Sequence, residues 1–407
     1  MQLIGAILFV FALLHTFSAK AFERLSHKYP RHGGLLHLLG EVEVVFGFWA
    51  MVLLVAMACV AGPQNAIAYA ETQQYTEPLF VFVVMVVAAS KPVLDFVQRM
   101  IDILSGGRPL LQAWMGLALV PLAGSLITEP AAMTLAALML APQIFRDGLP
   151  EWQKYAALGV LFVNVSVGGT LTAYAAPPVL MVAATWQWDS AFMAANFGWK
   201  ATLAVLVNAS ALTWLLRNSL QGNAPRPTAS TRAPLATSMI HLAFLAAVVM
   251  LAHHPVLFLG LFLFFLGFTS AYPQHQSPLI LKEALLVGFF LAGLVVLGSM
   301  QQWWLQPIVE SLQPLALFFG ALGLTAITDN AALTYLGSLI DGIQPQAQYM
   351  LVAGAVAGGG LTVIANAPNP AGVALLRKGF RDESIGALGL LAGALAPTAV
   401  AAAAFFL

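Results

Sequence analysis

Charged residues are scarce in this 407-residue sequence, in which Asp, Glu, Lys and Arg make up only 8% of the chain. A typical soluble domain contains about 25% charged residues, so this composition excludes a soluble protein with a single membrane anchor. With 60% hydrophobic residues, it predicts an all-α polytopic membrane protein whose main partner is the lipid bilayer. The 17 basic and 17 acidic residues cancel, and therefore no nucleic-acid partner is implied.

Several sequence features that point to other classes of protein are missing. The single cysteine, Cys59, lies in an apolar run, which excludes an internal disulfide and suggests no thiol chemistry. The sequence has no nucleotide-binding loop, so we do not expect ATP-driven transport by this chain alone. It also lacks the Gly-x-Gly-Asp stretch that is typical of intramembrane aspartyl proteases. We therefore predict a protein that is not an enzyme and needs no cofactor.

One stretch of sequence occurs twice. Ser125–Thr134 reads Ser-Leu-Ile-Thr-Glu-Pro-Ala-Ala-Met-Thr, and Thr325–Thr334 reads Thr-Ala-Ile-Thr-Asp-Asn-Ala-Ala-Leu-Thr. The two align without a gap and place Glu129 over Asp329. A carboxylate inside an apolar segment of a membrane protein is costly. Two such carboxylates at equivalent positions of a repeated stretch indicate that they have a function.

A second pair of stretches follows these two. Residues 168–178 read Gly-Gly-Thr-Leu-Thr-Ala-Tyr-Ala-Ala-Pro-Pro, and residues 358–370 contain Gly-Gly-Gly-Leu-Thr followed by Asn-Ala-Pro-Asn-Pro. Glycines and prolines in the middle of apolar segments interrupt helices. Interrupted helices at corresponding positions of two halves are typical of transporters built from repeats, which bind their substrates where the helices unwind.

Hydropathy places these stretches within two similar halves. The halves cover residues 1–217 and 236–407, and a polar linker rich in Pro, Ser and Thr joins them at 218–235. Each half is predicted to have five crossings, one of which is interrupted, and one two-armed hairpin. The uninterrupted crossings lie at about residues 3–19, 40–61, 79–97, 191–216, 236–252, 256–271, 283–300 and 384–406. The hairpins lie at about 110–145 and 307–341, and the interrupted helices at about 155–186 and 348–376.

The basic residues predict the orientation of the chain. Fifteen of the 17 Lys and Arg fall on alternate loops, and the remaining two, Lys91 and Lys200, fall inside crossings. By the positive-inside rule the basic loops are cytoplasmic, and both termini lie on the outside. An odd number of crossings per half means that the halves have inverted topology, so the two hairpins open from opposite sides of the membrane. Glu129-Pro130 and Asp329-Asn330 at the turns favour re-entrant hairpins over full spans.

These four stretches resemble the ion transporter superfamily, which includes Na+/H+ antiporters, arsenite and citrate carriers and divalent anion symporters. More narrowly, the sequence resembles a family of bacterial Na+/H+ antiporters. The resemblance implies inverted repeats, a homodimer, elevator-like movement and a location in the bacterial inner membrane. Hairpin tips in the dicarboxylate branch resemble Ser-Asn-Thr, whereas here they contain Glu129 and Asp329. That departure favours a cation as the substrate.

A hard cation such as Na+ prefers oxygen ligands, which unwound backbone and polar side chains supply. The candidate cation- and proton-binding residues of the tips and breaks are Glu129, Asp329, Thr128, Thr328, Asn330, Asn366, Asn369, Thr172 and Thr362. Burial favours the protonated form of a carboxylate and a bound cation favours its charged form. Competition between Na+ and H+ for one carboxylate is therefore the simplest basis for exchange.

Other interpretations of the charged residues remain open at this stage. Glu129 and Asp329 could simply cap the second arm of each hairpin. Lys91 and Asp95 share a helical face and could form a structural ion pair or, with Lys200, a charge relay. Pro92 is expected to kink this helix, and Glu43 is expected to lie at the membrane interface. The alternative function is a Na+- or H+-coupled carrier of an anion, supported only by Lys91 and Lys200.

Overall fold

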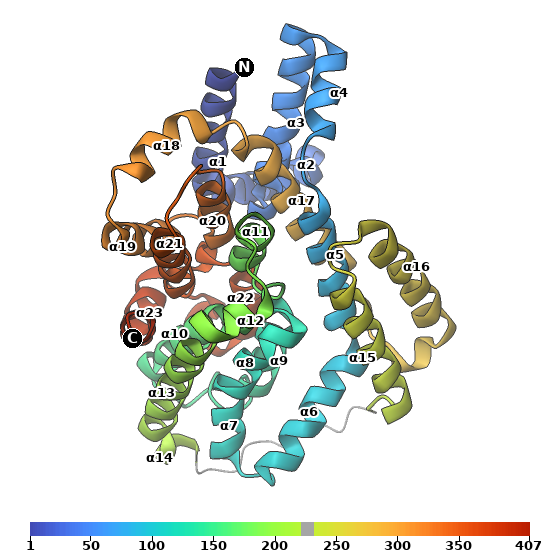
Figure 1. Ribbon diagram of the computed structural model, residues 1–407. Coiled ribbons are helices and arrows are strands. Elements are labelled where there is room, and N and C mark those ends of the chain that lie inside the picture. Colours follow the sequence, from blue (N-terminus) through green and yellow to red (C-terminus); the bar gives the residue numbers. More distant parts are fainter. Residues whose placement is uncertain (221–231) are drawn as a thin grey trace.

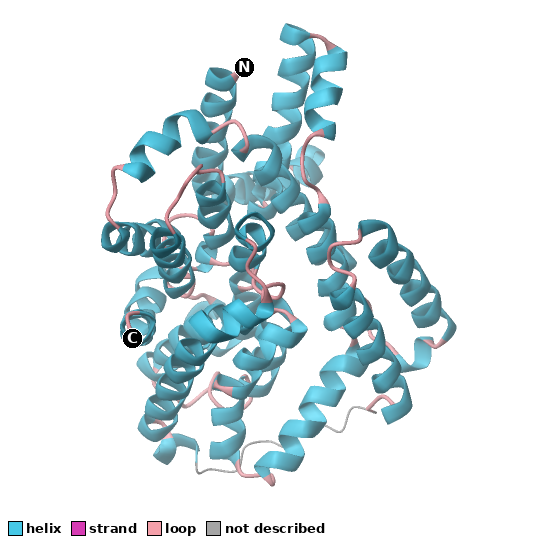
Figure 2. Cartoon of the chain, in the orientation of Figure 1, coloured by secondary structure: helices cyan, strands magenta, loops and turns pink. Residues whose placement is uncertain are grey.

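A computed structural model describes residues 1–220 and 232–407 of the chain. Within that part the protein is helical throughout and has no strand (Figure 2). Six helices are long and apolar enough to cross a membrane, and the number rises to eight if each of two bent pairs is one span. The predicted all-α polytopic membrane protein is confirmed at this level. The central part of the predicted linker, residues 221–231, lies outside the described residues.

The first half begins with six helices, two of which, α2 and α4, are short and pack mainly against α1 and α3. They are α1 (Gln2–Lys28), α2 (Gly33–Gly40), α3 (Val42–Ala61), α4 (Pro63–Glu71), α5 (Thr76–Ala88) and α6 (Lys91–Ser105). The pair α5 and α6 bends by 60° at Ala89-Ser90, directly before Lys91-Pro92. A proline in the first turn cannot donate the backbone hydrogen bond that would continue the preceding helix. The kink expected at Pro92 is therefore present.

The first carboxylate stretch lies between two arms. The first arm is α7 (Pro109–Leu117) and α8 (Leu119–Ile127), bent by 42°, and the second arm is α9 (Glu129–Leu140). The helix that follows, α10 (Glu151–Gly168), ends in a 3-10 turn at Gly169–Leu171, and helical structure resumes at α11 (Pro177–Trp186). This interruption falls where the glycines and prolines predict it. The half closes with α12 (Ser190–Met193), a π-helical turn at Ala194–Gly198, α13 (Trp199–Leu215) and α14 (Arg217–Leu220).

The second half has a similar order. It contains α15 (Leu235–Met250), α16 (Pro255–Ala271), α17 (Leu281–Gly298) and α18 (Gln302–Glu310). The second carboxylate stretch lies between α19 (Pro314–Thr325) and α20 (Asn330–Ser338). The second interruption separates α21 (Pro345–Gly358) from α22 (Asn369–Leu376), and α23 (Ala387–Phe405) closes the chain.

Helices of the two halves pack closely against one another (Figure 1). α10 contacts α23 where Gly159 faces Gly393, because a Cβ at either glycine would collide with backbone of the neighbouring helix. Small residues of this kind let membrane helices approach closely. The second arm of each hairpin also contacts the second part of the other half's interrupted helix: α9 lies against α22, and α20 against α11. Both carboxylate stretches therefore lie beside a helix break of the opposite half.

The buried hydrophobic residues form two large clusters. One is built mainly from α7 to α13 and α21 to α23, and the other mainly from α1, α3, α5 and α15 to α17. Ile127 and Ala131 of the first hairpin, Leu180 of α11 and Ala331 of α20 belong to the second cluster. The hairpin tips thus lie where the two clusters meet.

Candidate functional site

The tip of the first hairpin is a strained turn. Thr128 separates α8 from α9 and has φ 75° and ψ 152°, a conformation that non-glycine residues rarely adopt. Strain of this kind costs of the order of 1–3 kcal/mol and is concentrated at functional sites. The side chain is 2% exposed, and its hydroxyl has no hydrogen-bond partner among the described residues. The turn therefore places a buried hydroxyl directly beside Glu129.

Glu129 is completely buried between the two helix breaks. Its Oε2 accepts a hydrogen bond of 2.8 Å from Nδ2 of Asn366, which belongs to the second break. Its Oε1 lies against Gly169 of the first break, where an added Cβ would come within 2.5 Å of that oxygen. The Glu129 side chain makes no capping hydrogen bond to α9. The capping interpretation is therefore wrong for Glu129, because its carboxylate turns away from its own helix towards the other half.

Asp329 has a different role in the second hairpin. Its Oδ1 accepts hydrogen bonds from the backbone N–H groups of Ala331 (2.8 Å) and Ala332 (3.3 Å). The capping interpretation is confirmed here, since these bonds satisfy donors of the first turn of α20. Asp329 also lies close enough to Glu129 for their charges to interact. Oδ1 of Asp329 therefore caps α20, whereas Oδ2 makes no capping hydrogen bond to this helix.

Three buried asparagines surround the second break. Asn330 and Asn369 are fully buried and Asn366 is 1% exposed. Nδ2 of Asn369 donates to the carbonyl oxygens of Gly359 (2.8 Å) and Thr362 (2.9 Å), which lie in the interruption between α21 and α22. Asn330, at the start of α20, lies against Gly359, where an added Cβ would come 3.0 Å from its Nδ2. The amides of Asn330 and Asn369 therefore face the unwound segment, whereas that of Asn366 donates from it to Glu129.

A threonine hydroxyl in each helix break donates a hydrogen bond to the hairpin of the same half. Oγ1 of Thr172 donates to the carbonyl of Ser125 (2.7 Å), and Oγ1 of Thr362 donates to the carbonyl of Ala326 (2.9 Å). In the aligned stretches the donor Thr172 corresponds to Thr362, and the acceptor Ala326 lies one residue after the position that aligns with Ser125. Ser125 adds a second connection by donating to the carbonyl of Gly168 (2.7 Å). Thr172 and Thr362 thus hold backbone in place at the site.

Buried polar atoms without partners are concentrated at this place. Among the described residues, seven of eleven such side-chain atoms belong to the hairpin tips and the second break. They are Thr128 Oγ1, Glu129 Oε1, Thr325 Oγ1, both amide atoms of Asn330, Asn366 Oδ1 and Asn369 Oδ1. An unsatisfied buried polar group costs about 1–3 kcal/mol, so seven would cost of the order of 10 kcal/mol, as much as the whole stability of many domains. Six of the seven are oxygens, the atoms that a hard cation or water would satisfy.

Two of the three charged residues predicted as a relay, Lys200 and Asp95, have their hydrogen-bond partners away from the hairpin tips. Nζ of Lys200 donates to the Tyr349 hydroxyl (2.9 Å) and lies 3.5 Å from the carbonyl oxygen of Phe405, at the end of α23. Oδ2 of Asp95 accepts from the backbone N–H of Ala233 (2.8 Å). Lys91 is the first residue of α6, at the bend after α5.

Thr328 of the second tip is half-buried, and its backbone N–H donates to the carbonyl of Leu324 (2.9 Å).

Some residues at the site were not among the predicted ligands. Ser166, near the end of α10, lies against Gly359, and Thr325 is fully buried beside the second tip. A polar residue two positions before the Gly168-Gly169 pair was the available signal for Ser166, and alignment with Ser125 was the signal for Thr325. Glu43 of α3 lies close enough to Asp329 for their charges to interact. No sequence pattern connects α3 with the second hairpin, so Glu43 was expected only at the interface.

Comparison with known proteins gives one match. A family model described as "Putative Na+/H+ antiporter" matches residues 1–407, the whole of the chain. No curated protein matches the sequence. The wider resemblance to the ion transporter superfamily stays a prediction.

Proposed function

The chain belongs to the family described as "Putative Na+/H+ antiporter", and on this premise we propose that it exchanges Na+ or Li+ for H+ by alternating access. The observation that supports this most is the set of buried oxygens without partners at the hairpin tips and the second break. Carboxylate, hydroxyl and amide oxygens together suit a hard monovalent cation better than an anion. The proposed location is the bacterial inner membrane, with both termini outside.

Glu129 is proposed as the carboxylate for which Na+ and H+ compete. Among the residues that the structure describes, its Oε1 has no hydrogen-bond partner, and its Oε2 accepts from Asn366. A bound cation favours the charged form of a buried carboxylate, and removal of the cation favours the protonated form. Asp329 contributes its charge while it caps α20. Each ion therefore displaces the other.

Movement is proposed to occur between the two hydrophobic clusters. The tips lie where the clusters meet, and the contact includes small residues such as Ala131 and Ala331. A sliding movement of the hairpins and interrupted helices against α1, α3, α5 and α15 to α17 would carry the site from one side to the other. We further propose inverted repeats, re-entrant hairpins and a homodimer, which rest on the repeated stretches and on the resemblance.

The anion alternative receives no support from Lys200. Its ammonium contacts Tyr349 and the end of α23 rather than the hairpin tips. A cation at the end of a helix is stabilised by the helix dipole, which accounts for the position of this half-buried lysine. A Na+- or H+-coupled carrier of an anion stays the alternative function.

The proposal can be tested in proteoliposomes by the recovery of a quenched pH-sensitive dye. Addition of Na+ or Li+ should collapse the pH gradient, and Glu129→Gln should abolish this response. Matched controls are Glu71→Gln and Asp147→Asn, which remove exposed carboxylates away from the site. If neither cation collapses the gradient with folded, correctly inserted protein, the proposal fails, and uptake of carboxylates should be measured instead.

A further inference from the structure

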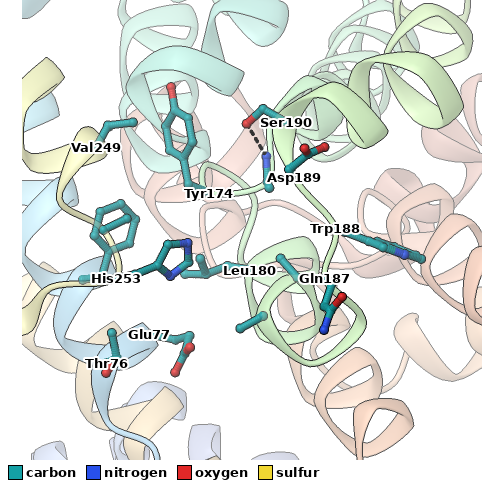
Figure 3. Close-up of a pocket in the computed structure, with 15 residues that line it drawn as sticks. Thr76, Glu77, Tyr174, Leu180, Gln187, Trp188, Asp189, Ser190, Val249 and His253 are labelled. Carbon is teal, nitrogen blue, oxygen red and sulfur yellow. Dashed lines mark hydrogen bonds between the residues drawn. The ribbon is translucent and has the colours of Figure 1, made fainter.

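A cavity of about 580 Å³ lies between α5 and α15 on one side and α11 and the loop to α12 on the other. One wall comes from the start of α5 and the loop after α15, with Glu77 and His253 (Figure 3). The facing wall comes from α11 and the loop to α12, with Leu180 and Asp189. The cavity has space for many water molecules, since one water molecule occupies about 30 Å³ in the liquid.

The cavity reaches the first helix break. Ala173 and Tyr174, which line it, belong to the unwound segment between Leu171 and Pro177. The backbone N–H of Ala173 donates to Oγ of Ser190 (3.3 Å), which holds the segment against the start of α12. The adjoining residue, Thr172, donates to the carbonyl of Ser125 in the hairpin that contains Glu129. The cavity therefore borders the unwound segment that is hydrogen-bonded to the hairpin of Glu129.

The charges around the cavity favour cations. The carboxylates of Glu77 and Asp189 lie on opposite walls, and no Lys or Arg is among the lining residues that the structure describes. Oδ1 of Asp189 accepts from the backbone N–H of Phe192 (2.7 Å), which fixes its position. The loops at this end, residues 62–78, 186–190 and 253–255, contain no Lys or Arg. A cavity with acidic walls and low-dielectric surroundings raises the local concentration of cations.

We propose that this cavity is the access vestibule of the cation on the side opposite the basic loops, and that Glu77 and Asp189 concentrate monovalent cations in it. The assignment rests on the proposed function for the identity of the cation. The aqueous and cation-attracting character of the vestibule does not rest on it. The two statements therefore have separate tests.

Access can be measured with introduced cysteines, because the chain has a single cysteine. In a Cys59→Ser background, Ala184→Cys and Ala252→Cys place a thiol on each wall of the cavity. Membrane-impermeant thiosulfonates, one cationic and one anionic, are added to right-side-out or inside-out vesicles. We expect labelling from the outer face only, with the cationic reagent at least about 10-fold faster. The control is Leu263→Cys on the exposed face of α16. We expect this face to contact lipid, so the cysteine should not react with a membrane-impermeant reagent.

Neutralising the walls tests the role of the two carboxylates. In Glu77→Gln/Asp189→Asn, the preference for the cationic reagent should fall to about that of free cysteine. The Na+ concentration for half-maximal exchange should rise about 3- to 10-fold, with the maximal rate retained. Labelling from the basic-loop side, no labelling of either cysteine, or equal rates for both reagents would overturn the inference. Charge-selective labelling without any Na+/H+ exchange would instead overturn the proposed function and leave an aqueous cation-attracting cavity.

Discussion

Asn366 donates a hydrogen bond of 2.8 Å to Glu129 across 237 positions of the sequence. The bond joins the second helix break to the tip of the first hairpin. Through it an amide of one half orients a carboxylate of the other. A carboxylate held in this way is oriented before any ion arrives, which reduces the ordering that ion binding must supply.

Asn366→Ala should move exchange to higher pH. A hydrogen bond donated to a carboxylate favours its charged form, so the variant holds its proton more tightly. Activity that rises as the carboxylate deprotonates should therefore begin at a higher pH than in the wild type, measured by dye recovery between pH 6 and 9.

The matched control for this variant is Asn65→Ala on exposed α4, where the pH profile should not change. An unchanged profile in Asn366→Ala would show that the Asn366 bond does not set the proton affinity of the site.

Gly169→Ala should block exchange by displacing the Glu129 carboxylate. The new Cβ would come within 2.5 Å of Oε1 and 2.7 Å of Cγ, distances that force the side chain to move. A displacement of about 1 Å at a binding constellation costs of the order of 100-fold in rate. Gly320→Ala on α19, where an added Cβ meets nothing within 4 Å, should leave exchange intact. Equal activity of the two variants in the dye assay would argue against a role for Oε1.

Two substitutions of Asp329 should separate its capping from its charge. Asparagine caps helices about as well as aspartate, so Asp329→Asn should leave the thermal stability close to that of the wild type. Asp329→Ala should lower the free energy of unfolding by about 0.5–2 kcal/mol. Both should reduce exchange, because both lose the charge beside Glu129. Full exchange by Asp329→Asn, with unfolding followed by fluorescence in detergent, would limit Asp329 to capping.

Lys200→Met should reduce stability and leave exchange in place. The variant loses the hydrogen bond to Tyr349 and a positive charge at the end of α23, an effect worth about 0.3–1 kcal/mol for the charge. Lys378→Met, at an exposed position, is the control for stability. Loss of exchange in a folded Lys200→Met protein would support the charge-relay interpretation.

The positions of the helix breaks and hairpin turns could be read from the sequence because they depend on local chemistry. Paired glycines and prolines such as Gly168-Gly169 and Pro177-Pro178 disfavour a continuous helix by their own backbone chemistry, and the structure has the first break there. The acidic turn at Asp329 was recognisable as a helix cap for the same reason. Alignment of the two stretches then indicated Glu129 and Asp329 as a pair.

The direction of each side chain could not be predicted in this way. Glu129 and Asp329 align in sequence, yet one points to Asn366 and the other to its own backbone. The difference depends on packing between the halves, which no local pattern records. The short helices α2 and α4 were likewise missed, since neither is long or apolar enough to stand out from a loop.

The exchange of partners between α9 and α22 and between α20 and α11 has a consequence for biosynthesis. When α11 leaves the ribosome, the helix that covers it has not yet been translated. At about 5–20 residues per second, the wait for α20 is of the order of 10 s. During that time the first half is in the membrane with the Pro177–Trp186 segment and the Glu129 turn uncovered. A chain truncated after α14 should therefore be a target of membrane quality-control proteases, because its own sequence cannot complete the burial of either element.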